Sequence, residues 1–363
     1  MPVLAAIAVV GILIVVHELG HFLAARLQGI IVTRFAIGFG PVLWRYQGRV
    51  TEYSLRAIPL GGYVAFPDDE LEEDLNSSDP GLLKNRPILD RAIVMVAGVL
   101  ANLIFAYLLL MTQLGTVGIP EFQPQPGVQI PQLVSTMSSA AGEAGLQAMD
   151  VVIQVNGQPL PPGSVGIDRM QEAILSSQGS RLELLVLRDQ EQLEFSVAPQ
   201  IDEDGIPRIG VQLAPNGQFI FHKATHLTQL INQSNQEFER ISRLTVLGFA
   251  HLISNFQEAA SQLSGPVAIV AMGADIAKSN AGNLLQFAAL ISINLAFINI
   301  LPLPALDGGQ LLFLAFEGIR GKPLPVQFQQ GVMQTGLFLI MGLGVLLIVR
   351  DTANLSWVQQ LMQ

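Results

Sequence analysis

The stretch from Ala5 to Ala25, AAIAVVGILIVVHELGHFLAA, constrains the fold of this chain more than any other. It is apolar and long enough to cross a membrane as a helix, which needs about 20 residues. Near its end lies HELGH, in which His17 and His21 are four residues apart and therefore share one helix face. Two such imidazoles can bind one metal ion, and the adjacent Glu18 can act as a general base toward water. Because ionisable side chains inside an apolar span are costly, we interpret the motif as functional and not as a coincidental pair of histidines.

The composition supports a membrane protein that carries a polar domain. The chain has 363 residues, of which 50% are hydrophobic and only 13% charged, whereas a soluble domain is about a quarter charged. The net charge of -10 argues against nucleic acid as a partner. The chain has no cysteine, which excludes disulfides, thiolate metal ligands and a cysteine nucleophile. No Lys or Arg precedes Arg26, so residues 1–27 are expected to be a retained first span and not a signal peptide.

Two segments of different character follow the first span. Residues 28–66 are rich in Val, Ile, Tyr and Phe, with turn signals such as Gly38-Phe39-Gly40-Pro41, and predict a small membrane-associated β element. It is either an ordinary interfacial hairpin or an edge strand that pairs with an extended substrate. Residues 67–92 begin with the acidic run from Pro67 to Pro80 and predict a solvated cytoplasmic loop.

The next part of the chain predicts a second span and then a soluble domain. Residues 93–115 form the second span, and its one strongly polar residue, Asn102, predicts a hydrogen bond to another helix. Residues 116–213 resemble a PDZ domain in the segment AGLQAMDVVIQVNG, where Met149 stands at a position usually taken by glycine. By that resemblance Ile209, Gly210 and Val211 are the candidate peptide-carboxylate loop. The alternative is a small α/β domain without a ligand.

The C-terminal part predicts an amphipathic region and two further spans. Residues 214–283 form the amphipathic helical region, which lies on the membrane surface or packs on the other helices. Residues 284–319 form the third span, which contains Asn299 and the segment LPLPALDGG, and residues 331–350 form the fourth. The expected fold class is therefore a polytopic α-helical membrane protein of about four spans, with a small β element and an inserted α/β PDZ-like domain.

Asp307 is the outstanding candidate for a third metal ligand. It follows two prolines and precedes two glycines inside an apolar region, where a broken helix is tolerated only within protein or beside a cavity. A carboxylate in that place favours a cation. Asn299 lies nearby in sequence and can donate a hydrogen bond to a substrate carbonyl or an oxyanion.

Taken together, HELGH, GFGP, the PDZ-like insert, SGPVAIV and NILPLPALDGG resemble the site-2 protease family of intramembrane zinc metalloproteases, most closely its bacterial RseP group. The resemblance implies that His17, His21 and Asp307 bind Zn²⁺, that Glu18 activates water, and that Asn299 contacts substrate. It also implies single-span membrane protein substrates, such as anti-sigma factors or signal-peptide remnants, and an upstream site-1 protease that cuts them first. Room for only one PDZ domain is the departure from the proteobacterial pattern.

The basic residues predict the orientation in the membrane. Eight of them lie between the first and second spans, and positive residues favour the cytoplasm: Arg26, Arg34, Arg45, Arg49, Arg56, Lys84, Arg86 and Arg91. We therefore expect a multi-pass protein of the bacterial inner membrane, with the active site toward the cytoplasm and the PDZ-like domain outside. Two alternatives remain open, a metal transporter that uses the same ligands and a catalytically silent PDZ membrane adaptor.

Overall fold

In the computed structural model, residues 2–67, 79–133, 140–201, 205–255, 264–279 and 281–353 are described. The chain divides into two compact units, residues 1–117 with 223–363, and residues 118–222. Within the expected cytoplasmic loop, residues 68–78, which are most of the acidic run from Pro67 to Pro80, lie outside the described residues.

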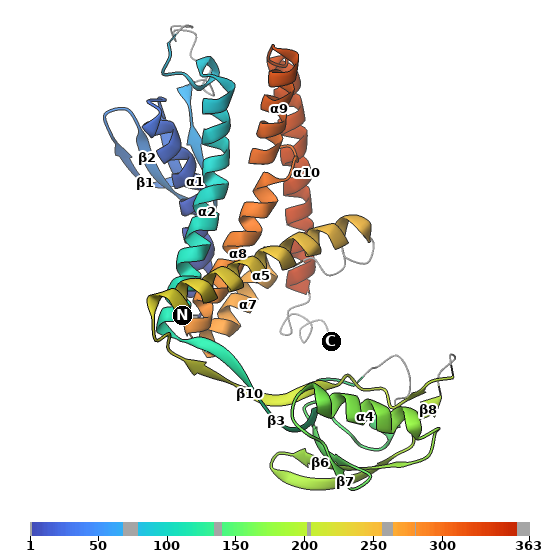
Figure 1. Cartoon of the computed structure of the whole chain (residues 1–363). Coiled ribbons are helices and arrows are strands. Elements are labelled where there is room, and N and C mark those ends of the chain that lie inside the picture. Colours follow the sequence, from blue (N-terminus) through green and yellow to red (C-terminus); the bar gives the residue numbers. More distant parts are fainter. Residues whose placement is uncertain are drawn as a thin grey trace. The chain divides into compact units, whose positions relative to one another are not determined.

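The first unit is built on apolar helices (Figure 1). Four of its described helices are long and apolar enough to cross a membrane: α1 (Pro2–Leu27), α2 (Ile88–Thr116), α8 (Ala281–Ile300) and α10 (Val326–Ala353). Three more described helices belong to this unit: α5 (Leu227–Ser254), α7 (Pro266–Ser279) and α9 (Asp307–Arg320). A short 3₁₀ turn, η2 (Leu83–Asn85), precedes α2. The four expected spans are therefore present as helices, and α10 begins five residues before the expected position 331.

Small residues let α1 and α2 approach closely. A side chain on Gly20 of α1 would collide with the backbone of Ala97 and the side chain of Ala101 on α2. In a lipid environment, where no hydrophobic force drives helices together, such close backbone contact is a main source of helix association. Farther along α2, a second contact with α5 and α8 is formed by buried apolar residues: Ala106, Leu110, Ile241, Ala289 and Ile293.

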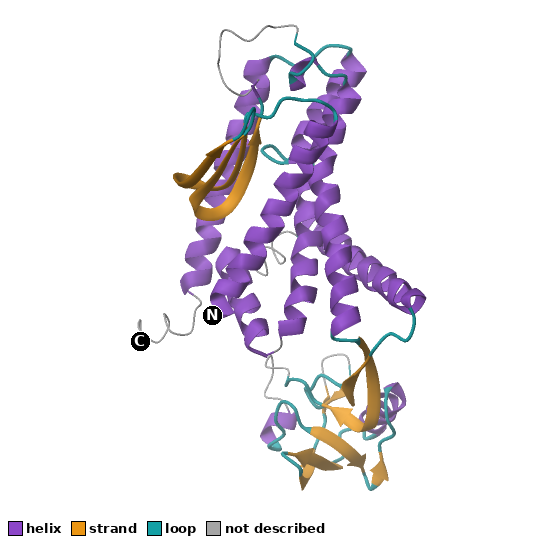
Figure 2. Ribbon diagram, turned by 90° about the vertical axis from the view of Figure 1, so that its left-hand side faces the viewer, coloured by secondary structure: helices purple, strands orange, loops and turns teal. Residues whose placement is uncertain are grey.

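The β element forms from two long, bent strands, β1 (Arg34–Gln47) and β2 (Glu52–Ala65), which lie beside α1 (Figure 2). Residues 34–37 pair in parallel with 52–55 and, on their other side, in the reverse direction with 62–65. Residues 45–47 fold back onto 52–54. Each strand thus contributes two segments, and segment 62–65 lies at one edge, where no described strand pairs with its free side.

The proline-rich segment divides the expected third span into two helices. α8 ends at Ile300, residues 301–306 form an irregular turn, and α9 begins at Asp307. Gly308 and Gly309 are required here, because a Cβ on Gly308 would overlap the carbonyl oxygens of Ile300 and Leu301, and a Cβ on Gly309 would overlap that of Leu303. An ion pair between Arg91 of α2 and Glu317 of α9, both largely buried, joins the two helices. The turn sets where α9 begins, and the ion pair holds the last turn of α9 against the first turn of α2.

The second unit is an α/β domain. Its sheet has the order β10-β3-β4-β6-β7, with β5 paired to β4. The strands are β3 (Ile119–Gln129), β4 (Val151–Val155), β5 (Gln158–Pro159), β6 (Leu182–Arg188), β7 (Glu191–Val197) and β10 (Ala214–His222). Helices α3 (Ala140–Glu143) and α4 (Ser164–Ser176) and a small pair, β8 (Gln200–Ile201) with β9 (Pro207–Arg208), complete the unit. It extends nine residues past the expected end at 213, because β10 joins the sheet.

Two residues of this unit, Met149 and Asp150, explain parts of the segment that resembles a PDZ domain. Met149 has φ 72°, the left-handed conformation that glycine adopts without strain, which is why glycine is the usual residue there. Asp150 is buried and accepts two hydrogen bonds of 2.7 Å from Arg188. Burial alone would raise the pKa of Asp150, but the Arg188 guanidinium and the Gln147 amide outweigh it and lower that pKa.

Candidate metal centre

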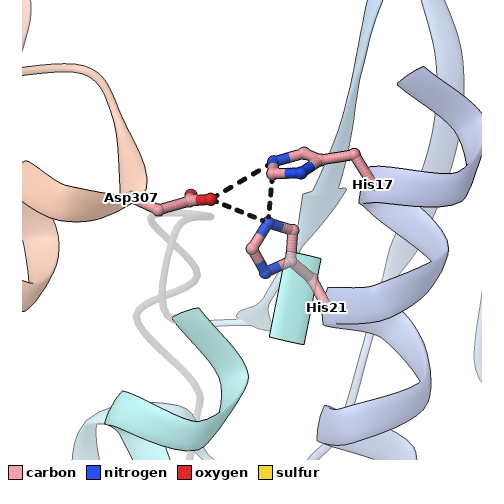
Figure 3. A group of neighbouring side chains, drawn as sticks. All are labelled: His17, His21 and Asp307. Atoms are coloured by element: carbon pink, nitrogen blue, oxygen red, sulfur yellow. Dashed lines mark hydrogen bonds and ion pairs between the residues drawn. The ribbon is translucent and has the colours of Figure 1, made fainter. Parts of the chain in front are cut away.

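His17, His21 and Asp307 converge on one point, as Figure 3 shows. The Nε2 atoms of His17 and His21 lie 3.2 Å apart, because one helical turn places both rings on the same face of α1. Asp307 Oδ2 lies 3.2 Å from His17 Nε2 and 3.4 Å from His21 Nε2. All three side chains are largely buried.

These three separations match the spacing of ligands around a tetrahedral ion. Ligand atoms about 2.0–2.2 Å from zinc lie roughly 3.3–3.5 Å from one another in a tetrahedron. In addition, Asp307 Oδ2 is buried and accepts no hydrogen bond from any described residue. Three ligands leave a fourth position open, which is typical of catalytic zinc sites and not of structural ones. The residues therefore fit a zinc ion.

Helix α2 forms the other wall of the centre through positions 94, 98 and 102, which share one helix face. The Val94 carbonyl lies 2.8 Å from His21 Nδ1 and accepts a hydrogen bond from it. Gly98 leaves room for both rings, since a Cβ there would lie 2.6 Å from His21 Cε1 and 2.8 Å from His17 Cε1. The amide of Asn102 lies 3.5 Å from His17 Nδ1.

The centre opens into a cavity of about 440 Å³, which also contains the predicted base Glu18 and the predicted substrate contact Asn299. Glu18 and Asn299 line it beside the metal-site residues, and the Asn299 amide nitrogen lies 3.1 Å from His17 Nε2. Residues 61–64, which include most of the edge segment of β2, line the cavity as well. The strand backbone comes so close to Glu18 that a Cβ on Gly62 would lie 2.9 Å from Glu18 Cγ.

Five of the site residues expected from the sequence line this cavity: His17, Glu18, His21, Asn299 and Asp307. Ile209, Gly210 and Val211 belong to the second unit, where Ile209 is buried in the core, Gly210 has φ 75° and Val211 pairs with Leu133. Sequence reasoning missed the contribution of α2. Asn102 was recognisable as the one strongly polar residue of its span, but nothing in the sequence indicated that its partner is a metal ligand.

The site combines two histidines one helical turn apart with an aspartate and a neighbouring glutamate, all set among apolar helices. This combination defines the class of metallopeptidases whose active site lies within a bundle of apolar helices. The comparisons with known proteins agree. The model of peptidase family M50 matches residues 5–343, and the chain belongs to this family, the site-2 proteases.

Three relatives illustrate the match. A Nostoc protein whose name classes it as a zinc metalloprotease is 54% identical over 367 residues, which cover 100% of both chains. The chloroplastic membrane metalloprotease ARASP of Arabidopsis thaliana is 44% identical over 99% of this chain and 80% of its own length. The regulator of sigma-W protease RasP of Bacillus subtilis is 28% identical over 97% of this chain and 98% of its own.

Proposed function

We propose that this protein is a zinc-dependent intramembrane endopeptidase of the site-2 type. One observation carries the proposal: His17, His21 and Asp307 hold three ligand atoms 3.2–3.4 Å apart in a cavity that is also lined by Glu18 and by a strand edge with which no described strand pairs. A transporter built on the same ligands would need polar residues along several spans. A silent adaptor would have no use for an intact set of ligands and base.

Each residue has a role that follows from its chemistry. Zinc, when bound, polarises a carbonyl and lowers the pKa of water to about 7. Glu18 accepts a proton from the attacking water and passes it to the nitrogen of the leaving amine. The Asn299 amide donates a hydrogen bond to the carbonyl oxygen of the scissile bond as negative charge develops there. Asp307 lies at the first turn of α9, where the helix dipole favours its negative charge.

The edge of β2 provides a way to present the substrate. A helical transmembrane segment hides its amide bonds, so the residues around the cleavage point have to unwind. Segment 62–65 offers backbone groups on its free side, and an extended peptide can pair with them as an added strand. The peptide would then run along the cavity wall next to Glu18.

The substrates we propose are single-span membrane proteins that an upstream site-1 protease has already cut, with the reaction taking place in or near the bilayer. The name of RasP, a regulator of sigma-W, favours anti-sigma factors among them. Signal-peptide remnants are the other candidate class. The proposed location is the bacterial inner membrane, which the protein crosses several times.

Cleavage of a single-span protein by the purified enzyme in detergent tests this function. We expect cleavage inside or next to the transmembrane segment, its loss with a chelator, and its return when zinc is added back. A matched reaction with a soluble unfolded protein shows whether cleavage is confined to membrane segments. Cleavage that is unaffected by the chelator would contradict the proposal.

The orientation can be tested with single cysteines, because the chain has none of its own. The basic residues between the first two spans favour a cytoplasmic position for that loop. We therefore expect a cysteine at the exposed Lys84 to react with an impermeant reagent only from the cytoplasmic side. A cysteine at the exposed Ser196 should react only from outside. The reverse pattern would contradict the proposed topology.

The second unit is, in this proposal, a PDZ domain that filters substrates by size. It joins the first unit just past the end of α2, 14 residues beyond Asn102, or about 21 Å along the helix. In the orientation proposed above, this unit is outside while the metal centre is toward the cytoplasm, so we do not assign it a contact with the scissile bond. Its effect would be on the outer part of a substrate, which is admitted after trimming and excluded before. The alternative is capture of the new C-terminus through the loop Ile209–Val211.

Removal of this unit separates the two alternatives. Ile119 and His222 are paired, so the ends left by deleting residues 118–222 lie side by side and a short linker can join them. We expect the deletion to permit cleavage of untrimmed substrates. Under capture, it would instead slow cleavage of trimmed substrates, and Gly210→Glu in the intact chain would do the same. Unchanged cleavage of both forms would contradict both roles.

A further inference from the structure

The two metal-binding histidines need more than their metal-facing nitrogens. Both present Nε2 to the centre, so the proton of each neutral ring is on Nδ1. A ring held in this way normally donates its Nδ1–H to an oxygen, which fixes both the tautomer and the ring plane. The question for each histidine is therefore which oxygen accepts that hydrogen bond.

For His21 the acceptor is plain. The Val94 carbonyl lies 2.8 Å from His21 Nδ1, and a carbonyl can only accept. This hydrogen bond holds the ring against α2 and leaves Nε2 free for the metal.

For His17 the structure offers the side chain of Asn102. Its amide nitrogen lies 3.5 Å from His17 Nδ1, while its Oδ1 is buried and has no hydrogen-bond partner in the described part of the chain. The Asn102 side chain is fully buried, and an unsatisfied amide oxygen in that position is costly. Among the described residues, the other side-chain amide near this ring is that of Asn299, which lies closer to Nε2, at 3.1 Å, than to Nδ1, at 3.5 Å. It faces the metal side of the ring.

We infer that Asn102 is the positioning residue of His17. A half-turn of its amide about the Cβ–Cγ bond exchanges nitrogen and oxygen, so that Oδ1 faces Nδ1–H. The half-turn gives the buried oxygen a donor and replaces two facing N–H groups with a hydrogen bond. Asn102 then does for His17 what the Val94 carbonyl does for His21, and α2 orients both rings from one face. The inference rests on the proposed metal centre.

The backbone of Asn102 provides a matched control. The Ser292 hydroxyl of α8 donates a hydrogen bond of 2.8 Å to the Asn102 carbonyl oxygen. Ser292→Ala therefore removes a buried contact at the same residue without changing what faces His17. If Asn102 serves only to hold α2 against its neighbours, Ser292→Ala and loss of the Asn102 side chain should have similar effects.

The test is zinc affinity, measured by competition with a chromophoric chelator on the full-length protein in detergent. We expect Asn102→Leu to weaken zinc binding about 10- to 100-fold, the usual effect of losing such a partner. Asn102→Asp, which keeps an acceptor at the same distance, should stay within a few-fold of wild type, as should Ser292→Ala. Thermal unfolding of the metal-free proteins shows whether each variant is folded, and Asn102→Ala replaces the leucine variant if that one is not.

Two results would overturn the inference. One is wild-type affinity in a folded Asn102→Leu or Asn102→Ala protein. The other is an equal loss in Ser292→Ala, which would assign Asn102 a purely structural role. If the wild-type protein does not bind zinc, the proposed function and this inference are both contradicted. If the wild type binds zinc and the Asn102 variants bind it with the same affinity, only the inference is contradicted.

Discussion

The Glu18→Gln variant should bind zinc like the wild type and lose proteolysis. Glutamine keeps the size of the side chain and its place against Gly62 but cannot accept the proton of the attacking water. Loss of a general base typically costs 10²- to 10⁴-fold in rate, and we expect a loss of at least about 10²-fold here. The ligand atoms belong to His17, His21 and Asp307, so the metal should stay.

Metal content and single-turnover cleavage, measured on the same preparation, check this prediction. Asp307→Asn is the complementary variant, because it weakens a ligand and leaves the base intact. It should lose zinc and activity together. A Glu18→Gln protein that lacks zinc would mean that Glu18 is a ligand, and the roles would have to be reassigned.

The Gly98→Ala variant should lose metal affinity although it adds only one methyl group. The new Cβ would lie within van der Waals overlap of both imidazoles, 2.8 Å from His17 Cε1 and closer still to the His21 ring. The rings cannot move away without losing the Val94 hydrogen bond or the spacing of their Nε2 atoms. Overpacking of this kind costs about 1–3 kcal/mol, which corresponds to a loss of roughly 5- to 150-fold in zinc affinity if the bound geometry carries the strain.

Gly11→Ala is the matched control, since Gly11 lies in α1 and a Cβ there meets no atom within 4 Å. Alanine favours a helix over glycine by up to about 1 kcal/mol, so this variant should be as stable as wild type or more so, with unchanged zinc affinity. The measurement is the same chelator competition for both. Equal affinities in Gly98→Ala and Gly11→Ala would show that α2 does not limit the space around the histidines.

The three candidate metal ligands could be picked out because each lies in a sequence context that is costly without a function. His17 and His21 interrupt an apolar span at helical spacing, and Asp307 sits between prolines and glycines in another. That the three residues act together was expected from the resemblance to known proteases, and the structure gives their separations of 3.2–3.4 Å. Nothing in the local sequence pattern specifies a contact between α1 and α9.

Three features escaped prediction for physical reasons: the strand β10, the partner of Asn102 and the role of Gly98. β10 has Phe219 and Phe221 exposed and is held to β3 through backbone pairing, so it lacks the buried alternating face that indicates a strand. Asn102 indicates that its span has a polar contact, but a side chain alone does not specify the partner. Gly98 gave no signal at all, because the need for a missing Cβ becomes visible only when the two rings are in place.

In the sequence, the second unit separates the residues of the metal centre into two groups. His17, His21, Gly98 and Asn102 are made before it, whereas Asn299 and Asp307 are made after it. During synthesis the ribosome therefore releases the segment with both histidines first, then the second unit, and only after it the carboxylate that completes the set. The protease is therefore expected to be inactive until α9 has been made. A chain that stops before α9 is expected to remain inactive.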